Sequence, residues 1–436
     1  MKTTQEGLKR EVGVWGLSAN IVNVMIGAGI FVLPAIIAET MGASGVLAYL
    51  FCGLLIGLIM LCFAEVGSKV THSGGSYAYV ETALGAYPGF LVSIFYLMGS
   101  ILADAAVSNA LLEILGVIFP IFKNSTIRFF SLFILFSGLA SLNVIGVKQG
   151  IGLVKFTTVA KLIPILLLIT IGWKDVQWVN FAWETEPTIQ KLGETSLILF
   201  FAFMGGDAGL SIGGEIKNPQ KTVPRAILIG ILGVLLIYVM VQLVSQGILG
   251  SELPNLKEAP LAEASKIVFG PAGYTLLFIG TAVSMFGMIS GQILNNPRVI
   301  FRLSRDGVIP FSKLASIHRK FKTPYIAILL YAGLGFTLAN IGGFRALAVI
   351  SASSMLMVYF GVSISVIGLR RKKELTKGGF TIPFGYTVPI LSAGIILFFL
   401  SNLSTPEKQG IVILIGILTL IYFLGKAFRK WKINSD

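Results

Sequence analysis

Long apolar segments, separated by short polar stretches, follow one another along almost the whole chain. Each segment has about 20 residues or more, which is enough for a helix to cross ~30 Å of hydrocarbon. The pattern predicts an all-α polytopic membrane protein with twelve transmembrane helices. The expected limits, accurate to about three residues, are 14–38, 44–67, 87–115, 128–146, 149–172, 192–216, 224–248, 271–297, 324–342, 344–369, 386–403 and 409–428.

The composition supports this prediction. Of the 436 residues, 55% are hydrophobic and only 12% are charged, whereas soluble domains carry roughly 25% charged residues. The polar start, 1–11, precedes an apolar segment that is too long for a signal-peptide core and shows no small-residue cleavage site. We therefore expect this first segment to remain in the protein as a membrane span.

The basic residues are distributed unequally between alternate loops. The set of loops that includes the N-terminus holds about three times as many Lys and Arg residues as the opposite set, with the largest group in 298–322. This bias predicts a multi-pass protein of the plasma membrane with both termini in the cytoplasm. It also explains the formal charge of +14 as a topology signal, so we expect no nucleic-acid partner.

Residues typical of metal or catalytic sites are sparse. Cys52 and Cys62 lie ten residues apart in the second span and are expected to be buried thiols, and His72 and His318 lie in distant loops. The segment 209–213 matches the G-x-S-x-G pattern of hydrolases but lies inside a span, without the strand–turn–helix context of that motif. We expect neither a metal, nor a cofactor, nor an enzymatic activity.

The first span is interrupted by two glycines one residue apart. Gly27 and Gly29 are poor occupants of a helix interior, and a loosened backbone persists in a membrane only where it faces protein or a water-filled cavity. A helix broken here exposes N–H groups at Gly27, Ala28, Gly29 and Ile30, which attract an anion such as a carboxylate. The alternative is a groove of small residues for helix packing.

The sixth span shows the same feature. Phe200, Phe201 and Phe203 are followed by Met204 and by a glycine-rich segment, 205–214. Each glycine in a helix interior costs about 1 kcal/mol relative to alanine. Glycine-interrupted segments at matching places in two five-span halves predict an inverted repeat with a site at the midplane.

Five stretches together resemble one family, the amino acid–polyamine–organocation transporters. Within it, the chain is most similar to bacterial relatives of the L-amino-acid transporters, the light subunits of heteromeric exchangers. The stretches are GAGIF at 27–31, SGGSY at 73–77, FAF at 201–203 with Gly205 and Asp207, GEIKNP at 214–219 and SRDG at 304–307.

The resemblance implies the leucine-transporter fold, a 5+5 inverted repeat with broken helices 1 and 6 and two additional helices. It also implies sodium-independent movement of amino acids. The expected organisation is a cytoplasmic N-terminus 1–13, a first repeat 14–172, an outer loop 173–191, a second repeat 192–369, a cytoplasmic loop 370–385, helices eleven and twelve in 386–428, and a cytoplasmic C-terminus 429–436.

Two departures limit what can be transferred from the family. The eukaryotic exchangers carry a cysteine between spans three and four that bonds a heavy subunit, but the loop 116–127 contains none. We therefore expect no disulfide-linked partner. Asp207 stands where many relatives have Glu, Asn or an apolar residue, so the substrate rules of the subfamily do not transfer directly.

If the ligand is an amino acid, the two breaks are expected to bind different groups of it. The free N–H groups of the first break suit its carboxylate. Loosened carbonyls near Met25, Phe201 and Met204 suit its ammonium group. Phe200, Phe201 and Phe203 cannot all face one side, and we expect one of them to cover the substrate.

A lysine in the fifth span is the candidate for coupling and gating. Lys155 lies well inside the span, where an ionisable residue is a functional candidate. The resemblance places it where sodium-coupled relatives hold a cation, with backbone near Gly16 and the Ser284 hydroxyl as expected partners. The alternative is a lysine that extends to the inner interface. Lys161 is the rival, for which the sequence suggests no partner.

The acidic residues within the spans have less definite roles. Asp207 is expected either to tune substrate charge or carry a proton, or to cap loosened N–H groups of the sixth span. Asp104 and Glu113 in the third span have no assigned role.

These features predict an alternating-access transporter, an exchanger of small neutral L-amino acids that acts without sodium. The alternatives are a proton-coupled symporter and a transporter of cationic amino acids or polyamines. From another class, an ion channel would need a continuous polar pore, and no span shows a charged face that could form one.

Overall fold

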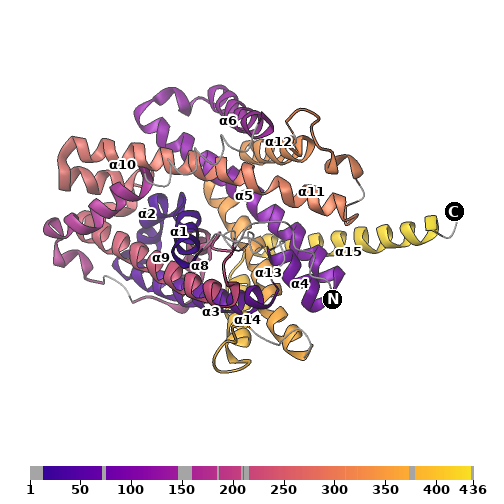
Figure 1. Cartoon of the computed structure of the whole chain (residues 1–436). Helices are drawn as coiled ribbons and strands as arrows, with labels where there is room; N and C mark the ends of the chain where they lie inside the picture. The colour runs from indigo at the N-terminus through magenta and orange to yellow at the C-terminus, as the bar shows by residue number, and fades with distance from the viewer. Residues whose placement is uncertain are drawn as a thin grey trace.

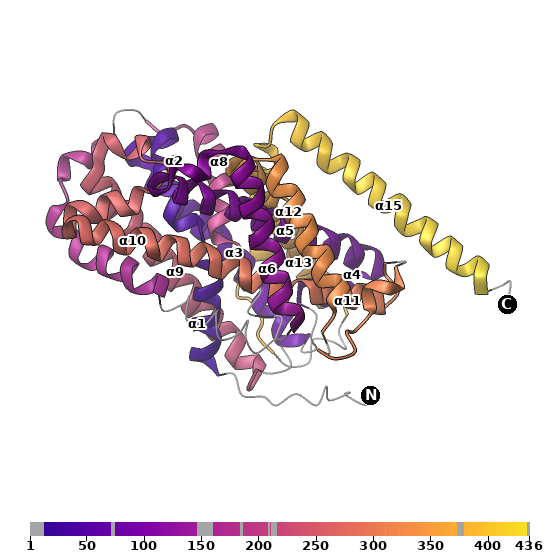
Figure 2. The same cartoon turned by 90° about the horizontal axis from the view of Figure 1, so that it is seen from above.

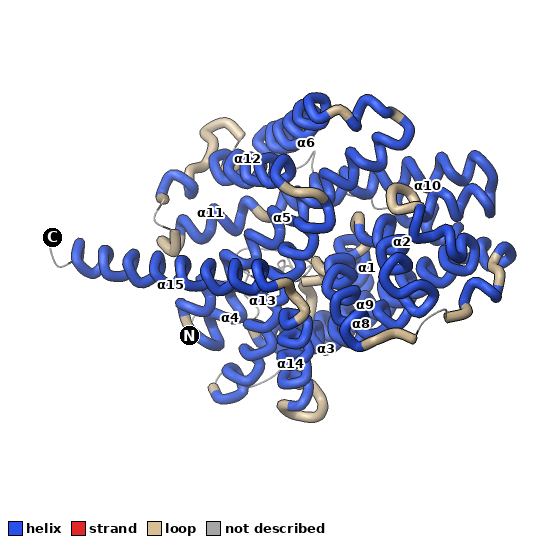
Figure 3. The backbone as a smooth tube through the Cα atoms, turned by 180° about the vertical axis from the view of Figure 1, so that it is seen from behind, coloured by secondary structure: helices blue, strands red, loops and turns tan. Residues whose placement is uncertain are grey.

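The computed structural model describes residues 13–433, apart from 71–74, 146–159, 184–185, 208–209, 211–215, 310, 322 and 373–378, and it describes side chains up to residue 424. The described chain is helical and contains no β-strand within these ranges (Figure 3). This confirms the predicted all-helical class.

The first half of the chain forms long helices joined by short turns. Its described elements are α1 (Val14–Met25), α2 (Gly29–Met41), the 3-10 turn η1 (Gly42–Gly45), α3 (Val46–Lys69), α4 (Gly75–Leu84), α5 (Ala86–Ile118), η2 (Pro120–Lys123) and α6 (Ser125–Ile145). Residues 160–171 are also helical. The short helix α4 begins within the stretch SGGSY at 73–77.

The second half begins with two short turns and a short helix. Its elements are η3 (Gly172–Asp175), η4 (Trp178–Phe181), α8 (Ile189–Leu199), η5 (Phe200–Phe203), α9 (Pro219–Leu249), η8 (Gly250–Asn255), α10 (Pro260–Asn295), α11 (Pro297–Arg305), η9 (Ser312–Ala315), α12 (Tyr325–Ile341), α13 (Phe344–Arg371), α14 (Thr387–Ser401) and α15 (Thr405–Ile433).

Every predicted span coincides at least in part with described helix, although several differ in length. By length and hydropathy, seven helical stretches of the described chain can cross a membrane, and α1, α12 and α14 are shorter apolar helices. Helix α10 starts at Pro260, eleven residues before the predicted span, and bends at Gly270, where φ is 70°. Part of the segment between the predicted spans 224–248 and 271–297 is therefore helical.

The helices pack as two groups. Helices α1, α2, α3, α8 and α9 form one group, which we call the bundle, and α4, α5, α10, α11, α12 and α13 form the other, which we call the scaffold. Figures 1 and 2 show α1, α2, α8 and α9 close together, with α5 and α13 beside them. The boundary between the two groups contains the interrupted helices.

Helix α15 lies at the edge of the molecule. It extends away from the other helices in both views (Figures 1 and 2). Tyr87 and Phe90 of α5 contact Tyr422 and Phe423 of α15 through tilted ring pairs with centroids 5.2–5.5 Å apart. Among the described helices, α15 contacts the scaffold mainly through α5.

Candidate functional site

The predicted interruption of the first span is present. Helix α1 ends at Met25, and α2 begins at Gly29. The Gly27 N–H donates to the Met25 carbonyl over 2.8 Å, and the Phe31 N–H donates to the Ala28 carbonyl over 3.0 Å. The N–H groups of Ala28, Gly29 and Ile30 find no acceptor among the described residues. Three of the four N–H groups expected to be free are therefore free of described partners, and Gly27 is the exception.

Packing around both positions leaves little room for a side chain, most clearly at Gly29. A Cβ atom on Gly27 would lie 2.7 Å from the Met288 sulfur of α10, and one on Gly29 would lie 2.7 Å from the Ala202 Cβ. Such distances are shorter than real Cβ contacts, so neither position has room for a side chain without rearrangement. The small-residue packing expected as an alternative thus coexists with the loosened backbone.

The sixth span is interrupted over a longer stretch. After α8 ends at Leu199, the turn η5 leads to Met204, whose backbone is extended with ψ 159°. Gly205 has φ +96°, a conformation that favours glycine. A Cβ on Gly206 would lie 2.9 Å from the Met25 sulfur. The two interruptions therefore cross in direct contact.

Tyr238 of α9 connects the two interruptions. Its hydroxyl lies 2.7 Å from the Met25 carbonyl oxygen and 2.7 Å from the Ala202 carbonyl oxygen. The side chain is fully buried, and its single proton can be donated to either oxygen. The sequence analysis predicted no role for Tyr238. A tyrosine in the middle of an apolar span was the available signal.

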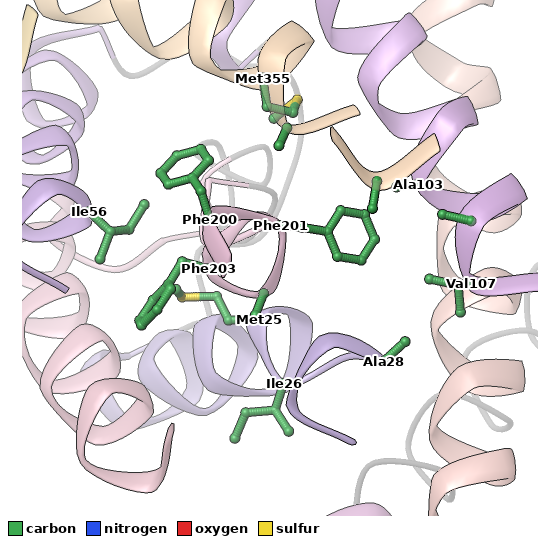
Figure 4. Packing of buried hydrophobic residues seen from close by; sticks show 14 of the residues in the cluster. Met25, Ile26, Ala28, Ile56, Ala103, Val107, Phe200, Phe201, Phe203 and Met355 are labelled. Carbon is green, nitrogen blue, oxygen red and sulfur yellow. The ribbon is translucent and has the colours of Figure 1, made fainter. Parts of the chain in front are cut away.

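The three phenylalanines point in different directions, as expected. Phe200 packs against Tyr359 and Phe399, and Phe203 packs against Tyr238 with ring centroids 4.9 Å apart. Figure 4 shows Phe201 pointing from its turn toward Ala103 of α5. Of the three, Phe201 is the one placed between the interruptions and the scaffold.

Lys161 reaches the first interruption. Its ammonium group donates to the carbonyls of Asn23 and Ile26, each over 2.6 Å, and the side chain is buried. Lys155 lies outside the described residues, so its expected contacts remain predictions. Gly16, expected to offer a carbonyl to Lys155, is exposed on α1.

Ser284 lies on the part of α10 that packs near Lys161 and the first interruption. On α10, Gly280 approaches Ala160 and Pro164, while Met288 approaches Gly27. Ser284 lies between these two contacts at helical spacing, and it is buried with no hydrogen-bond partner for its hydroxyl among the described residues. Among the described residues it is therefore Lys161, the rival of Lys155, that contacts the first span on this side of α10.

Asp207 is buried on the scaffold side of the second interruption. Its carboxylate accepts a hydrogen bond of 2.7 Å from the Tyr359 hydroxyl of α13. Ser76 of α4 also interacts with this carboxylate. This contact joins the interrupted sixth span to the scaffold.

Asp104 occupies a separate position between scaffold helices. It accepts a hydrogen bond of 2.8 Å from Tyr331 of α12, and the Tyr331 hydroxyl accepts one of 2.9 Å from Asn296. Glu113 is exposed on α5. Within the described residues, no three His, Cys, Asp or Glu side chains are grouped in a way that could hold a metal.

Two helices broken in mutual contact within a bundle of apolar helices are characteristic of secondary transporters. Comparison with known proteins agrees, because residues 12–425 match the model of the amino acid permease family. The chain belongs to this family, and it is a membrane transporter, not an enzyme.

Individual relatives match over nearly their full lengths. The chain is 31% identical to the serine/threonine exchanger SteT of Bacillus subtilis, covering 99% of this chain and all of that protein. It is 28% identical to the methylthioribose transporter of the same organism, over 97% of this chain and 95% of that one. It is also 28% identical to the mouse Asc-type amino acid transporter 1, over 97% of this chain and 82% of that protein. These matches confirm the resemblance to bacterial amino-acid transporters and eukaryotic light subunits.

Proposed function

We propose that this protein is a sodium-independent exchanger of small neutral L-amino acids that works by alternating access across the plasma membrane. The observation that carries the proposal is the pair of crossed interruptions, with N–H groups free of described acceptors on one and an aromatic side chain on the other. The names of the serine/threonine exchanger and the Asc-type transporter support the same class of substrate.

The first interruption supplies the site for the substrate carboxylate. The N–H groups of Ala28, Gly29 and Ile30 stand at the start of α2, where the helix dipole favours a negative charge. The Met25 carbonyl already receives Tyr238 and the Gly27 N–H. We therefore assign the substrate ammonium to carbonyls of the second interruption, at Phe201 and Met204.

The side chains around this place are apolar. Phe201, Ala28, Ala103, Val107 and Met355 are all buried and surround the region between the interruptions and α5 (Figure 4). None of the five can pair with a charged substrate side chain. This favours neutral amino acids over cationic ones or polyamines.

The position of Lys161 supports sodium independence. Its ammonium group occupies carbonyls of the first interruption that could otherwise coordinate a cation. A bound Na⁺ next to this ammonium would be strongly repelled within the membrane interior. We assign to Lys161 the coupling role that was expected of Lys155.

Asp207 and Tyr359 supply a contact that can report the state of the transporter. Asp207 belongs to the interrupted span, whereas Tyr359 belongs to the scaffold. Movement of one group against the other must lengthen this hydrogen bond. The contact therefore favours the state in which α13 and the sixth span lie together.

Purified protein in liposomes tests the proposal. We expect saturable uptake of labelled L-serine that is stimulated by unlabelled neutral amino acids inside and is the same in sodium and choline buffers. Uptake without an internal amino acid would exclude obligate exchange, and strict dependence on sodium would exclude the role of Lys161. Stimulation by internal arginine or putrescine in place of serine would exclude neutral specificity.

A proton-coupled symporter is the second candidate, because the buried Asp207 carboxyl lies at the interruption itself. A proton carried by Asp207 would require concentrative uptake into empty liposomes when the outside is acidic. The Asp207→Asn variant, which keeps a carbonyl oxygen for Tyr359, would abolish that stimulation by acid. Exchange that does not respond to a pH gradient favours the first candidate.

A further inference from the structure

Glu65, at one end of α3, receives an unusual number of hydrogen bonds. The Arg370 side chain of α13 binds both of its oxygens, the Lys69 ammonium binds at 2.7 Å and the Ile382 N–H binds at 2.9 Å. The Glu65 side chain is 1% exposed, that of Lys69 is 3% exposed and that of Arg370 is 12% exposed. We call these four residues the Glu65 knot.

The segment that follows α13 strengthens the knot. The Phe380 N–H donates to the Ser68 hydroxyl over 2.9 Å. Gly379 has φ +98°, and a Cβ there would lie 2.9 Å from the Ser68 oxygen, so the close approach requires glycine. On the other side, Lys372 donates to the Thr82 carbonyl of α4. The end of α3 is thereby fixed to α13, to the segment 379–382 and, through α13, to α4.

The knot joins helices that belong to different groups. Helix α3 packs along α9 and against α8 in the bundle, and α13 packs along α5 in the scaffold. Among the described helices of the two groups, α3 and α13 share the most extensive contact across the boundary. Other described polar ties across this boundary are single hydrogen bonds, such as the one between Asp207 and Tyr359.

These ties differ in how readily they can open. A lone hydrogen bond is readily exchanged for one with water. Separating Glu65 from its partners would instead leave buried charges unpaired, which is strongly unfavourable. From this difference we infer that the Glu65 knot is the fixed pivot of transport, about which the bundle tilts against the scaffold. This inference rests on the alternating access proposed above.

Distance measurements between spin labels test the pivot. One pair joins Gln220 and Arg371, both exposed. Gln220 lies one turn before Val223, which contacts Gly67 near the knot, and Arg371 follows Arg370. The other pair joins the exposed Trp15 of α1 and the exposed Phe311 after α11, neither of which belongs to the knot. Each residue is replaced by cysteine, and the native Cys52 and Cys62 are buried.

The labelled protein in liposomes is measured with and without a saturating amino acid that it transports. We expect the Trp15–Phe311 distribution to shift by several ångström and the Gln220–Arg371 distribution to keep its mean. An equal or larger shift across the knot would overturn the pivot, and so would the absence of any shift in both pairs. Uptake by the same labelled variants is the separate readout for transport, so active protein with a moving knot refutes the pivot alone.

A variant sharpens the same measurement. Glu65→Gln removes the charge that holds Arg370 and Lys69, so the Gln220–Arg371 distribution should broaden and become sensitive to substrate. Lys69→Met, which leaves the contacts of Arg370 and Ile382 with Glu65 in place, is the matched control and should broaden it less. A Glu65→Gln distribution as narrow as that of the parent would show that the knot does not fix this boundary.

Discussion

The two interrupted spans are broken in different ways. The first loses helical structure over three residues and resumes at once as α2, so it offers backbone N–H groups and almost no side chain. The second passes through a 3-10 turn and an extended residue, and it presents Phe201 on one side and Asp207 on another. The first interruption is thus suited to bind the carboxylate, which every amino acid shares. The second is suited to contact the side chain, which varies, and to respond to the conformational state of the protein.

The largest effect is expected from filling the first interruption. Gly29→Leu should reduce exchange to background, because its side chain would overlap Ala202 and displace the N–H groups. Gly57→Leu is the control, since a Cβ at Gly57 meets no atom within 4 Å, and it should insert and transport like the parent. Near-normal substrate binding by Gly29→Leu, measured by scintillation proximity, would contradict the assigned site.

Removal of the charge beside the first interruption should have the next largest effect. Lys161→Ala should raise the half-saturating concentration on the cytoplasmic side about tenfold, or ~1.4 kcal/mol, because two charge-assisted hydrogen bonds to α1 are lost. Liposomes with sorted orientation allow the two sides to be measured separately. Lys257→Ala, at an exposed ion pair with Glu39, should leave both sides unchanged. Equal effects on both sides would place Lys161 in the substrate site itself.

A smaller effect should follow from loosening the tie between the interruptions. Tyr238→Phe keeps the ring against Phe203 and removes only the hydroxyl that faces Met25 and Ala202. We expect the free energy of unfolding to fall by about 1 kcal/mol and exchange to slow on both sides to a similar extent. A change confined to one side would show that Tyr238 does not serve both interruptions.

The smallest effect should arise at the contact between the second interruption and the scaffold. Tyr359→Phe removes one hydrogen bond to Asp207, so the half-saturating concentration should change about two- to threefold, and on one side of the membrane only. Comparison with Tyr238→Phe in the same liposomes sharpens the difference between a tie within the bundle and a tie across its boundary. The same two-sided response from both tyrosines would remove that distinction.

The sequence predicted the interruptions well because glycines lie at the positions where the backbone departs from a regular helix. Gly27 and Gly29 marked the first break within two residues, and the run after Phe203 marked the second. In each case the signal and the structural feature lie within a few neighbouring residues.

Contacts between distant segments could not be predicted in this way. Tyr238 binds a carbonyl 213 residues earlier in the chain, and nothing near Tyr238 encodes that partner. Lys155 and Lys161 are six residues apart, so on a helix they face directions that differ by about 240°. Pro164 packs near Gly280 of α10, and the sequence of the fifth span alone does not contain that contact.

The contact between Gly29 and Ala202 has a consequence for how such proteins diverge. The two residues share space for a single methyl group, because a Cβ on Gly29 would fall 2.7 Å from the Cβ of Ala202. A larger residue at one position is tolerated only if the other becomes smaller. Positions 29 and 202 should therefore covary among descendants of one ancestor. A change from Gly29 with Ala202 to alanine at 29 with glycine at 202 would pass through a disfavoured single mutant. That intermediate would slow the divergence of the two interruptions relative to the helices around them.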